Sequence, residues 1–222
     1  MSRLYLAFAL PVVVLTTLAA GCATTQPEPA AGPTVGMEID PARADTAVFA
    51  GGCFWCMEKP FEELEGVASV VSGFAGGDVP NPTYDQVTTK TTGHYEVVEV
   101  IYDATVVPYD TLLQVYWHNV DPLDGGGQFC DRGSPYRPAI FVSTASERAA
   151  AEQTKEFLNG RFSSPVAVEI LDAAPFYAAE EYHQDFYRTN PARYTSYRIG
   201  CRRDARLDEL WGDNAGVLGP AL

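Results

Sequence analysis

The sequence predicts an α+β fold: a two-layer sandwich with helices packed on a mixed sheet, a variant of the ferredoxin-like arrangement, with long loops. Two observations support this prediction. From about residue 45 onward, short runs of β-branched and aromatic residues alternate with helical patterns, and the strands are few while the loops are long. Hydrophobic residues make up 46% of the chain and aromatic residues 12%, which is enough for a sizeable core.

The elements follow in order from local composition and periodicity. Strands are expected at 46–50, 67–72, 96–102, 139–143 and 166–171, where strong β-formers cluster. Helices are expected at 53–64, 108–120, 146–159 and around 178–187. Pro60 lies inside the first of these helices and should kink it or remove its hydrogen bond to the Cys56 carbonyl.

The longest expected loop spans residues 121–137 and is rich in glycine. Connections of this length are uncommon in compact domains unless they have a function or are disordered, so this loop is a candidate for function. Residues 74–82, which contain Gly-Gly and Asn-Pro, are expected to form a second loop, and the tail after the last helix is expected to be irregular.

The N-terminal segment is expected to lie outside the fold. A positive start is followed by a long apolar run and by small residues that lead to Cys22, which is typical of a secretory signal. The sequence "LAAGC" resembles the bacterial lipoprotein box, which implies lipidation of Cys22 and attachment to a membrane facing the periplasm or the exterior. The alternative is a plain cleaved signal with an incidental cysteine.

Four regions are therefore expected along the chain. Residues 1–22 form the signal, 23–44 a flexible tether rich in Pro, Ala, Thr and Gly, 45–214 the folded domain, and 215–222 a C-terminal tail. The formal net charge of −14 argues against a nucleic-acid partner, because phosphate binding requires a basic face. Nothing suggests more than a monomer.

The most informative stretch is "GGCFWC", in which a glycine pair precedes two cysteines three residues apart. A thiol at the start of a helix is favoured in its nucleophilic thiolate form by the helix dipole. Three interpretations compete. A zinc site needs four ligands, usually in two close pairs, yet Cys130 and Cys201 stand alone. A structural disulfide fits an exported protein. A catalytic thiol best explains the exposed junction between strand and helix.

Five segments in order resemble the A-type peptide methionine sulfoxide reductases. They are "GGCFWCMEKPFE" from Gly51, "NPTYDQV" from Asn81, "TGHYEVV" from Thr92, "DPLDGGGQFCDRGSPYR" from Asp121 and "NPARY" from Asn190. The resemblance extends over roughly residues 45–212. It implies reduction of the S epimer of methionine sulfoxide, in proteins or as the free amino acid, through a thiolate, a sulfenic acid and a disulfide.

The resemblance also implies roles for individual side chains around the sulfoxide. The matched positions are Cys53 as nucleophile, Glu96 as acid, Tyr84 and Tyr136 as hydroxyl donors to the oxygen, Phe54 and Trp55 as walls of the methyl slot, and Asp131 as a partner for substrate backbone or water. The acid must hold its proton near neutral pH, so partial burial of Glu96 is expected. His94, His118 and His183 carry no clear signal and are expected to be structural, the first in a loop and the others packed on helices.

The resolving thiol is where the sequence departs from the commonest family pattern. Cys56 occupies the place of a glycine, and only one cysteine, Cys201, lies in the tail. We expect Cys56 to resolve the sulfenic acid because it is close to Cys53, with Cys201 as the second candidate. Cys130 is expected to be a small buried residue.

A thioredoxin-like dithiol protein is the expected reductant, because no nucleotide or flavin site is recognisable; Gly125 to Gly127 lack the strand-to-helix context of a phosphate loop. No cofactor or metal is expected. Two alternatives to the reductase remain. One is a thioredoxin-like disulfide exchanger, and the other is a non-enzymatic surface lipoprotein stapled by disulfides.

Overall fold

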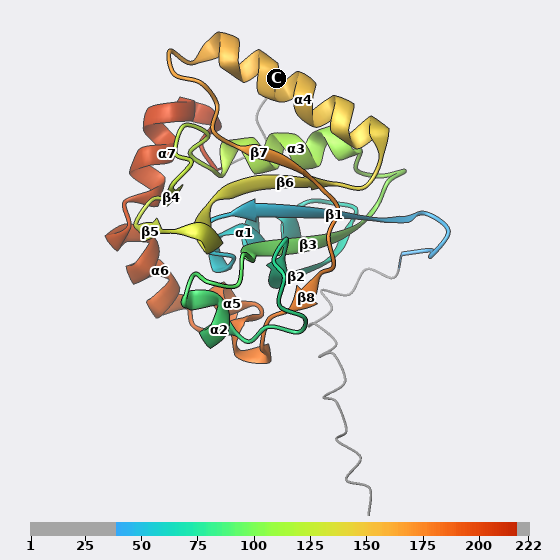
Figure 1. Cartoon of the computed structure of the whole chain (residues 1–222). Coiled ribbons are helices and arrows are strands. Elements are labelled where there is room, and N and C mark those ends of the chain that lie inside the picture. Colours follow the sequence, from blue (N-terminus) through green and yellow to red (C-terminus); the bar gives the residue numbers. More distant parts are fainter. Residues whose placement is uncertain (1–38, 217–222) are drawn as a thin grey trace, which may run out of the picture.

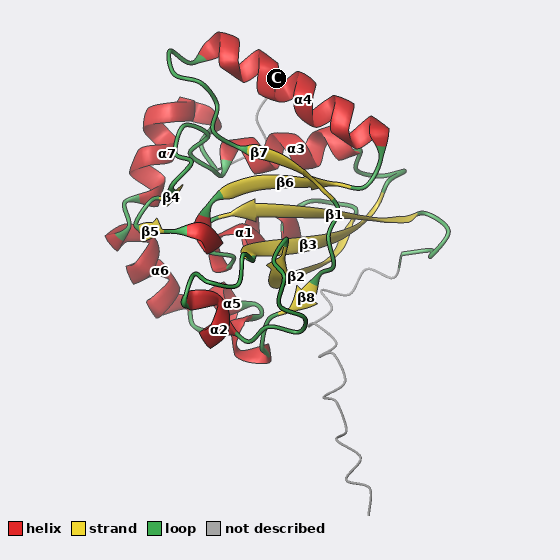
Figure 2. Cartoon of the chain, in the orientation of Figure 1, coloured by secondary structure: helices red, strands yellow, loops and turns green. Residues whose placement is uncertain are grey.

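A computed structural model of the chain describes residues 39–216, which form a mixed six-stranded sheet with helices packed around it (Figures 1 and 2). The strand order is β7-β6-β1-β3-β2-β8, in which only the β6–β7 pair is parallel. The strands are β1 (Ala44–Gly51), β2 (Val67–Ala75), β3 (Tyr95–Asp103), β6 (Pro138–Val142), β7 (Glu169–Asp172) and β8 (Tyr177–Ala178). The α+β prediction is confirmed.

Helices surround this sheet, and Figure 1 shows α6 and α7 together at one end of it, beside a small hairpin. The α-helices are α1 (Trp55–Glu62), α2 (Tyr84–Thr88), α3 (Tyr109–His118), α4 (Ala145–Arg161), α5 (Phe186–Thr189), α6 (Pro191–Gly200) and α7 (Arg203–Trp211). The hairpin pairs β4 (Gly127–Gln128) with β5 (Asp131–Arg132). Three short 3₁₀ turns complete the fold: η1 (Ser134–Tyr136), η2 (Glu181–His183) and η3 (Gly212–Asn214).

Local sequence accounts for the main elements. The β3 sequence YEVVEVIYD is rich in β-formers and pairs with β1 on one side and β2 on the other, so most of it is buried. The longest helix, α4, is capped by the Thr144 hydroxyl, which accepts a hydrogen bond from the Glu147 amide. The core is aromatic where the sheet meets the helices: Phe49 of β1 stacks on Phe61 at 5.1 Å and on Tyr116 at 5.3 Å between ring centroids.

Several expected boundaries are wrong. The first helix begins at Trp55, not at residue 53, and it continues two residues past Pro60. The 178–187 region contains a 3₁₀ turn and the four-residue α5 in place of one helix, and the tail forms α6 and α7 where irregular chain was expected. The 121–137 loop folds into the β4–β5 hairpin and η1. Two short elements, α2 and β8, were not predicted.

The predicted signal, most of the tether and Cys22 lie outside the described residues. Within residues 39–216, none of the helices is long and apolar enough to cross a bilayer.

Candidate active site

The predicted nucleophile lies in a tight turn between β1 and α1. Gly52 has φ +82°, in the left-handed region, and a Cβ added there would lie 2.5 Å from the Cβ of Gln128. A glycine is therefore required for both conformation and space. The turn is held closed by Cys56, whose amide donates to the Cys53 carbonyl at 3.0 Å.

Cys53 and Cys56 are both free thiols, and both are buried. Burial raises the pKa of Cys53, and its hydrogen bond to Cys56 adds to this effect. The same hydrogen bond lowers the pKa of Cys56 to about 6, helped by the charges of Arg203 and Arg198, although burial acts in the opposite direction. At neutral pH the pair therefore shares one negative charge, and the proton that Cys53 must lose can pass to Cys56.

Glu96 lies on β3, next to the turn that carries Cys53. Its Oε2 accepts a hydrogen bond from the Phe54 amide at 3.2 Å, while its Oε1 has no hydrogen-bond partner among the described residues. The side chain is 1% exposed, and this burial raises its pKa to about 8. Glu96 is therefore protonated at neutral pH, and its free oxygen is available to a ligand.

Tyr84 of α2 and Tyr136 of η1 face the same two groups. Burial raises the pKa of both phenols, and the charges of Glu96 and Cys53 raise it further, to about 12 for Tyr84. A hydrogen bond between the two hydroxyls opposes this rise at Tyr84. Both hydroxyls thus remain protonated donors beside the thiol and the carboxyl, from elements that lie 52 residues apart in the sequence.

Aromatic rings enclose the thiols on the helix side. Phe54 is buried, and Trp55 is half-buried and stacks on Phe186 at 3.7 Å between centroids. The Trp55 indole donates to Nδ1 of His183 at 3.0 Å, and the His183 ring lies 5.0 Å from the Phe54 ring. His183 thus lies in η2 and packs against Trp55 of α1, whose indole it fixes, so it packs on a helix as expected.

Asp131 of β5 also lies near the thiols, since its charge raises the pKa of Cys53. Its Oδ2 accepts a hydrogen bond from the Tyr197 hydroxyl on α6. The Trp55 and Tyr197 rings meet edge to face at 5.9 Å, so Tyr197 joins the carboxylate to the aromatic wall. Sequence reasoning did not identify Tyr197, because it lies in the tail that was expected to be irregular.

The structure corrects the expectations for the other two cysteines. Cys130 and Cys201 form a disulfide with a Cα–Cα distance of 4.9 Å across 71 residues. Cys130 is exposed rather than buried, and Cys201 is not a free thiol available for resolution in this state. Cys56 is therefore the only described free cysteine besides Cys53.

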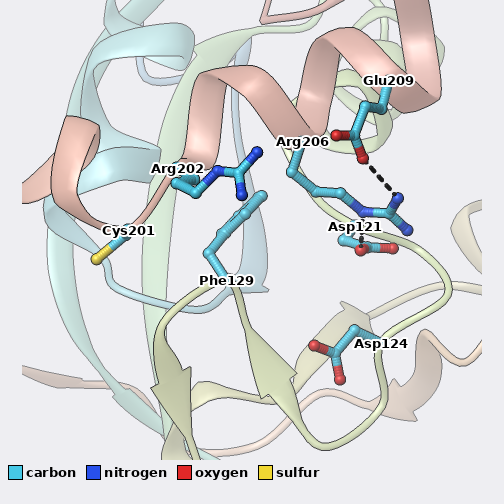
Figure 3. Close-up of a pocket in the computed structure, with 7 residues that line it drawn as sticks. All are labelled: Asp121, Asp124, Phe129, Cys201, Arg202, Arg206 and Glu209. Carbon is cyan, nitrogen blue, oxygen red and sulfur yellow. Dashed lines mark hydrogen bonds and ion pairs between the residues drawn. The ribbon is translucent and has the colours of Figure 1, made fainter.

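A surface pocket of about 320 Å³ lies beside this disulfide and contains, of the predicted site residues, only Cys201, the second candidate for the resolving thiol (Figure 3). Its lining residues are Asp121, Asp124, Phe129, Cys201, Arg202, Arg206 and Glu209. In the part of the chain from 39 to 216, no group of three or more His, Cys, Asp and Glu side chains is arranged to hold a metal ion. His94 lies just before β3, where its two ring nitrogens contact the Gly77 amide and the Val79 carbonyl, and His118 ends α3 against Trp211.

Comparisons with known proteins agree with this geometry. The family model described as peptide methionine sulfoxide reductase matches residues 45–215. The peptide methionine sulfoxide reductase MsrA of Bacillus licheniformis is 51% identical over 172 residues, which is 77% of this chain and 95% of that protein. MsrA 2 of Caulobacter vibrioides is 50% identical over 170 residues, covering 77% of this chain and 87% of that protein.

Solved structures give the same result. The structure of methionine sulfoxide reductase A of Corynebacterium diphtheriae superposes with a TM-score of 0.62 at 35% identity, covering 68% of this chain and 77% of the other. Reduced Mxr1 of Saccharomyces cerevisiae gives a TM-score of 0.64 at 27% identity, covering 69% of this chain and 90% of the other. The chain belongs to the peptide methionine sulfoxide reductase family.

Proposed function

We propose that the chain reduces the S epimer of methionine sulfoxide, in proteins and as the free amino acid, with Cys53 as nucleophile and Glu96 as acid. The observation that carries this proposal is a protonated, buried carboxyl beside a thiol that shares its proton with a neighbour. Sulfoxide reduction needs both groups at once, because sulfur must be attacked while the oxygen gains protons.

The proposed cycle balances in three steps. Cys53 sulfur attacks the sulfoxide sulfur, the oxygen is transferred to give methionine and Cys53 sulfenic acid, and Glu96 with Tyr84 and Tyr136 stabilises and protonates the oxygen. Cys56, which holds the proton taken from Cys53, then attacks the sulfenic sulfur; its proton leaves with the sulfenic hydroxyl as water, and the Cys53–Cys56 disulfide forms. A dithiol reductant finally exchanges with this disulfide and restores both thiols.

The aromatic groups supply the substrate pocket in this scheme. Phe54 and Trp55 are proposed to hold the methyl group, since their rings are fixed by His183 and Phe186 next to the thiol. Asp131 is proposed to bind the substrate backbone or an intervening water. Its bond to Tyr197 supports a role in holding the edge of the site.

The test compares the two epimers of a methionine sulfoxide with dithiothreitol as reductant. We expect turnover of the S epimer alone and loss of turnover in Cys53→Ser. Turnover of neither epimer contradicts the proposal. A disulfide exchanger would instead reduce insulin disulfides at a rate that does not depend on Glu96, and a disulfide-stapled lipoprotein without enzymatic activity would turn over neither substrate.

We further propose that the protein is exported, held at a membrane through lipidated Cys22, monomeric, and recycled by a thioredoxin-like dithiol protein. The N-terminal sequence supports the anchor, and the two-thiol cycle supports the reductant, because it ends in a disulfide. Fractionation of cells that express Cys22→Ala tests the anchor: the variant should leave the membrane fraction. Sedimentation of the detergent-solubilised protein tests the monomer.

A further inference from the structure

Arg203, at the start of α7, is buried beneath the active-site turn. It is 2% exposed. Its Nη2 donates to the Asn119 carbonyl at 2.6 Å, to the Gly51 carbonyl at 3.4 Å and to the Met57 sulfur at 3.2 Å. Gly51 lies two residues before Cys53, and Met57 directly follows Cys56. The guanidinium therefore contacts the chain on both sides of the thiol pair.

The charge of Arg203 has no carboxylate bonded to it within residues 39–216, where its acceptors are two carbonyl oxygens and a thioether sulfur. Arg198, by contrast, donates to the Asp204 carboxylate at 2.6 Å. A buried guanidinium is strongly disfavoured unless an anion offsets its charge. Two anions lie within reach of this charge: the Asp131 carboxylate, where the charge of Arg203 opposes the rise in pKa, and the thiolate of the cysteine pair, where it lowers the pKa of Cys56.

The Cys130–Cys201 disulfide crosslinks two segments that flank Arg203. Cys201 lies two residues before Arg203, and Phe129, next to Cys130, places its ring 4.3 Å from the guanidinium. Phe129 and Arg202 both have positive φ, +55° and +53°, so the chain turns sharply at each half of the disulfide. The crosslink therefore joins the ring and the backbone that surround Arg203.

A second set of contacts, made by Arg206, fixes the outer side of α7. Figure 3 shows Arg206, one turn after Arg203, between Asp121 and Glu209 at the wall of the surface pocket. The Arg206 guanidinium lies 2.7 Å from Asp121 and 3.1 Å from Glu209. The pair with Glu209 is exposed to solvent and therefore weak, whereas Asp121 is buried. The disulfide is the covalent constraint of the two.

We propose that Arg203, seated by the Cys130–Cys201 disulfide, is a positioning residue that stabilises the thiolate of the Cys53–Cys56 pair. The role of Cys56 in resolving the sulfenic acid rests on the proposed function, whereas the electrostatic effect on its thiol does not. Since Cys130 is exposed, a dithiol reductant in solution can reach the crosslink and reduce it to two thiols. The reactivity of the buried Cys53–Cys56 pair then depends on the oxidation state of the Cys130–Cys201 pair.

The test is a thiolate titration by absorbance at about 240 nm in the full-length protein carrying Cys22→Ser and Cys53→Ser, in which Cys56 is the one remaining free thiol. The titratable and charged groups around Cys56 are Glu96, Asp131, Tyr194, Tyr197, Arg198 and Arg203, with Cys53 in the native chain. Into this background we introduce Arg203→Gln, which keeps hydrogen-bond donors and removes the charge, and Arg203→Lys, which keeps the charge.

We expect Arg203→Gln to raise the titration midpoint of Cys56 by about one pH unit, as the loss of a nearby opposite charge does. Arg203→Lys should leave the titration midpoint of Cys56 close to its value with arginine at this position. Arg202→Gln is the matched control, because it removes the same charge from an exposed neighbour and should change nothing. Equal midpoints for Arg203→Gln and Arg202→Gln would overturn the proposal.

The seating by the disulfide is tested without changing Arg203. Cys130→Ser with Cys201→Ser should raise the midpoint in the same direction as Arg203→Gln, and an unchanged midpoint in this folded variant overturns the seating. This arm also keeps the proposal testable if Arg203→Gln does not fold. Because the titration needs no sulfoxide turnover, its failure is distinct from failure of the proposed reductase activity.

Discussion

Replacing Glu96 with glutamine should make the protein slower but more stable at neutral and alkaline pH. The amide keeps the shape of the side chain and the acceptor for the Phe54 amide, so the turn that carries Cys53 is preserved. It cannot give a proton to the sulfoxide oxygen. Loss of a positioned general acid costs about 10²- to 10⁴-fold in rate, and we expect a loss in this range in single-turnover release of methionine.

The stability change follows from the pKa of the same carboxyl. Burial raises this pKa from 4.5 to about 8, which corresponds to a penalty of about 5 kcal/mol on the ionised form. Between these two pH values the folded protein binds a proton at Glu96 that the unfolded chain has lost. The contribution of Glu96 to the free energy of unfolding of the wild type is therefore greatest below about pH 4.5. It falls as pH rises and reaches its minimum above about pH 8.

Glutamine does not titrate, so the variant does not lose free energy of unfolding at this position as pH rises. Compared with wild type, Glu96→Gln should gain up to about 3 kcal/mol in free energy of unfolding when pH is raised from about 5.5 to about 8. Urea unfolding at the two pH values measures the difference. Glu58, whose pKa burial also raises to about 8, is present in both proteins, so its effect cancels.

Glu99→Gln is the matched control, on the same strand and only half-buried. It should retain wild-type turnover. The reasoning is refuted if Glu96→Gln releases methionine as fast as wild type, or if its stability relative to wild type does not increase with pH. In wild type, the single-turnover rate should decline as Glu96 ionises with a midpoint near pH 8.

Three further predictions follow from the site. Cys56→Ser should release one equivalent of methionine and stop with sulfenic acid on Cys53, detected by mass spectrometry with a dimedone trap, and a Cys53–Cys201 disulfide there would contradict our assignment. Tyr84→Phe and Tyr136→Phe should each lower kcat/KM about 10²- to 10³-fold, as the loss of one donor to the developing oxygen charge does. Opening the Cys130–Cys201 disulfide, which encloses 71 residues, should lower unfolding stability by up to about 4 kcal/mol, measured by urea unfolding of the double-serine variant.

The central sheet could be predicted from sequence because its strands are dense in β-formers, as in β3. β3 pairs with β1 and β2 at its two edges and is buried along most of its length, so its apolar residues form a nearly continuous run. The tail helices were missed for the opposite reason. In α6 only Tyr194 is buried, and α7 buries Arg203, Leu207 and Trp211 among exposed charged residues. Their stability comes from tertiary contacts that periodicity does not reveal.

The candidate site was predicted from motif resemblance, and its geometry required the structure. Nothing in the local sequence of Tyr197 or Arg203 indicates that they lie beside Asp131 and the Cys53 turn. The Cys130–Cys201 pair was missed because the two cysteines are 71 residues apart and the connectivity of cysteines cannot be deduced from sequence alone. Cys130 and Cys201 were expected to be isolated because they are far apart in the sequence, but the fold brings them together.

The site combines two demands that oppose each other. Burial keeps Glu96 protonated, which suits an acid, but the same burial raises the pKa of Cys53, which disfavours the nucleophilic form. The helix dipole gives limited relief, because α1 begins two residues after Cys53. Positive charge and a proton acceptor must therefore come from elsewhere: Cys56 accepts the proton and Arg203 offsets the charge. A second thiol next to the first thus serves the first step of the reaction as well as the last.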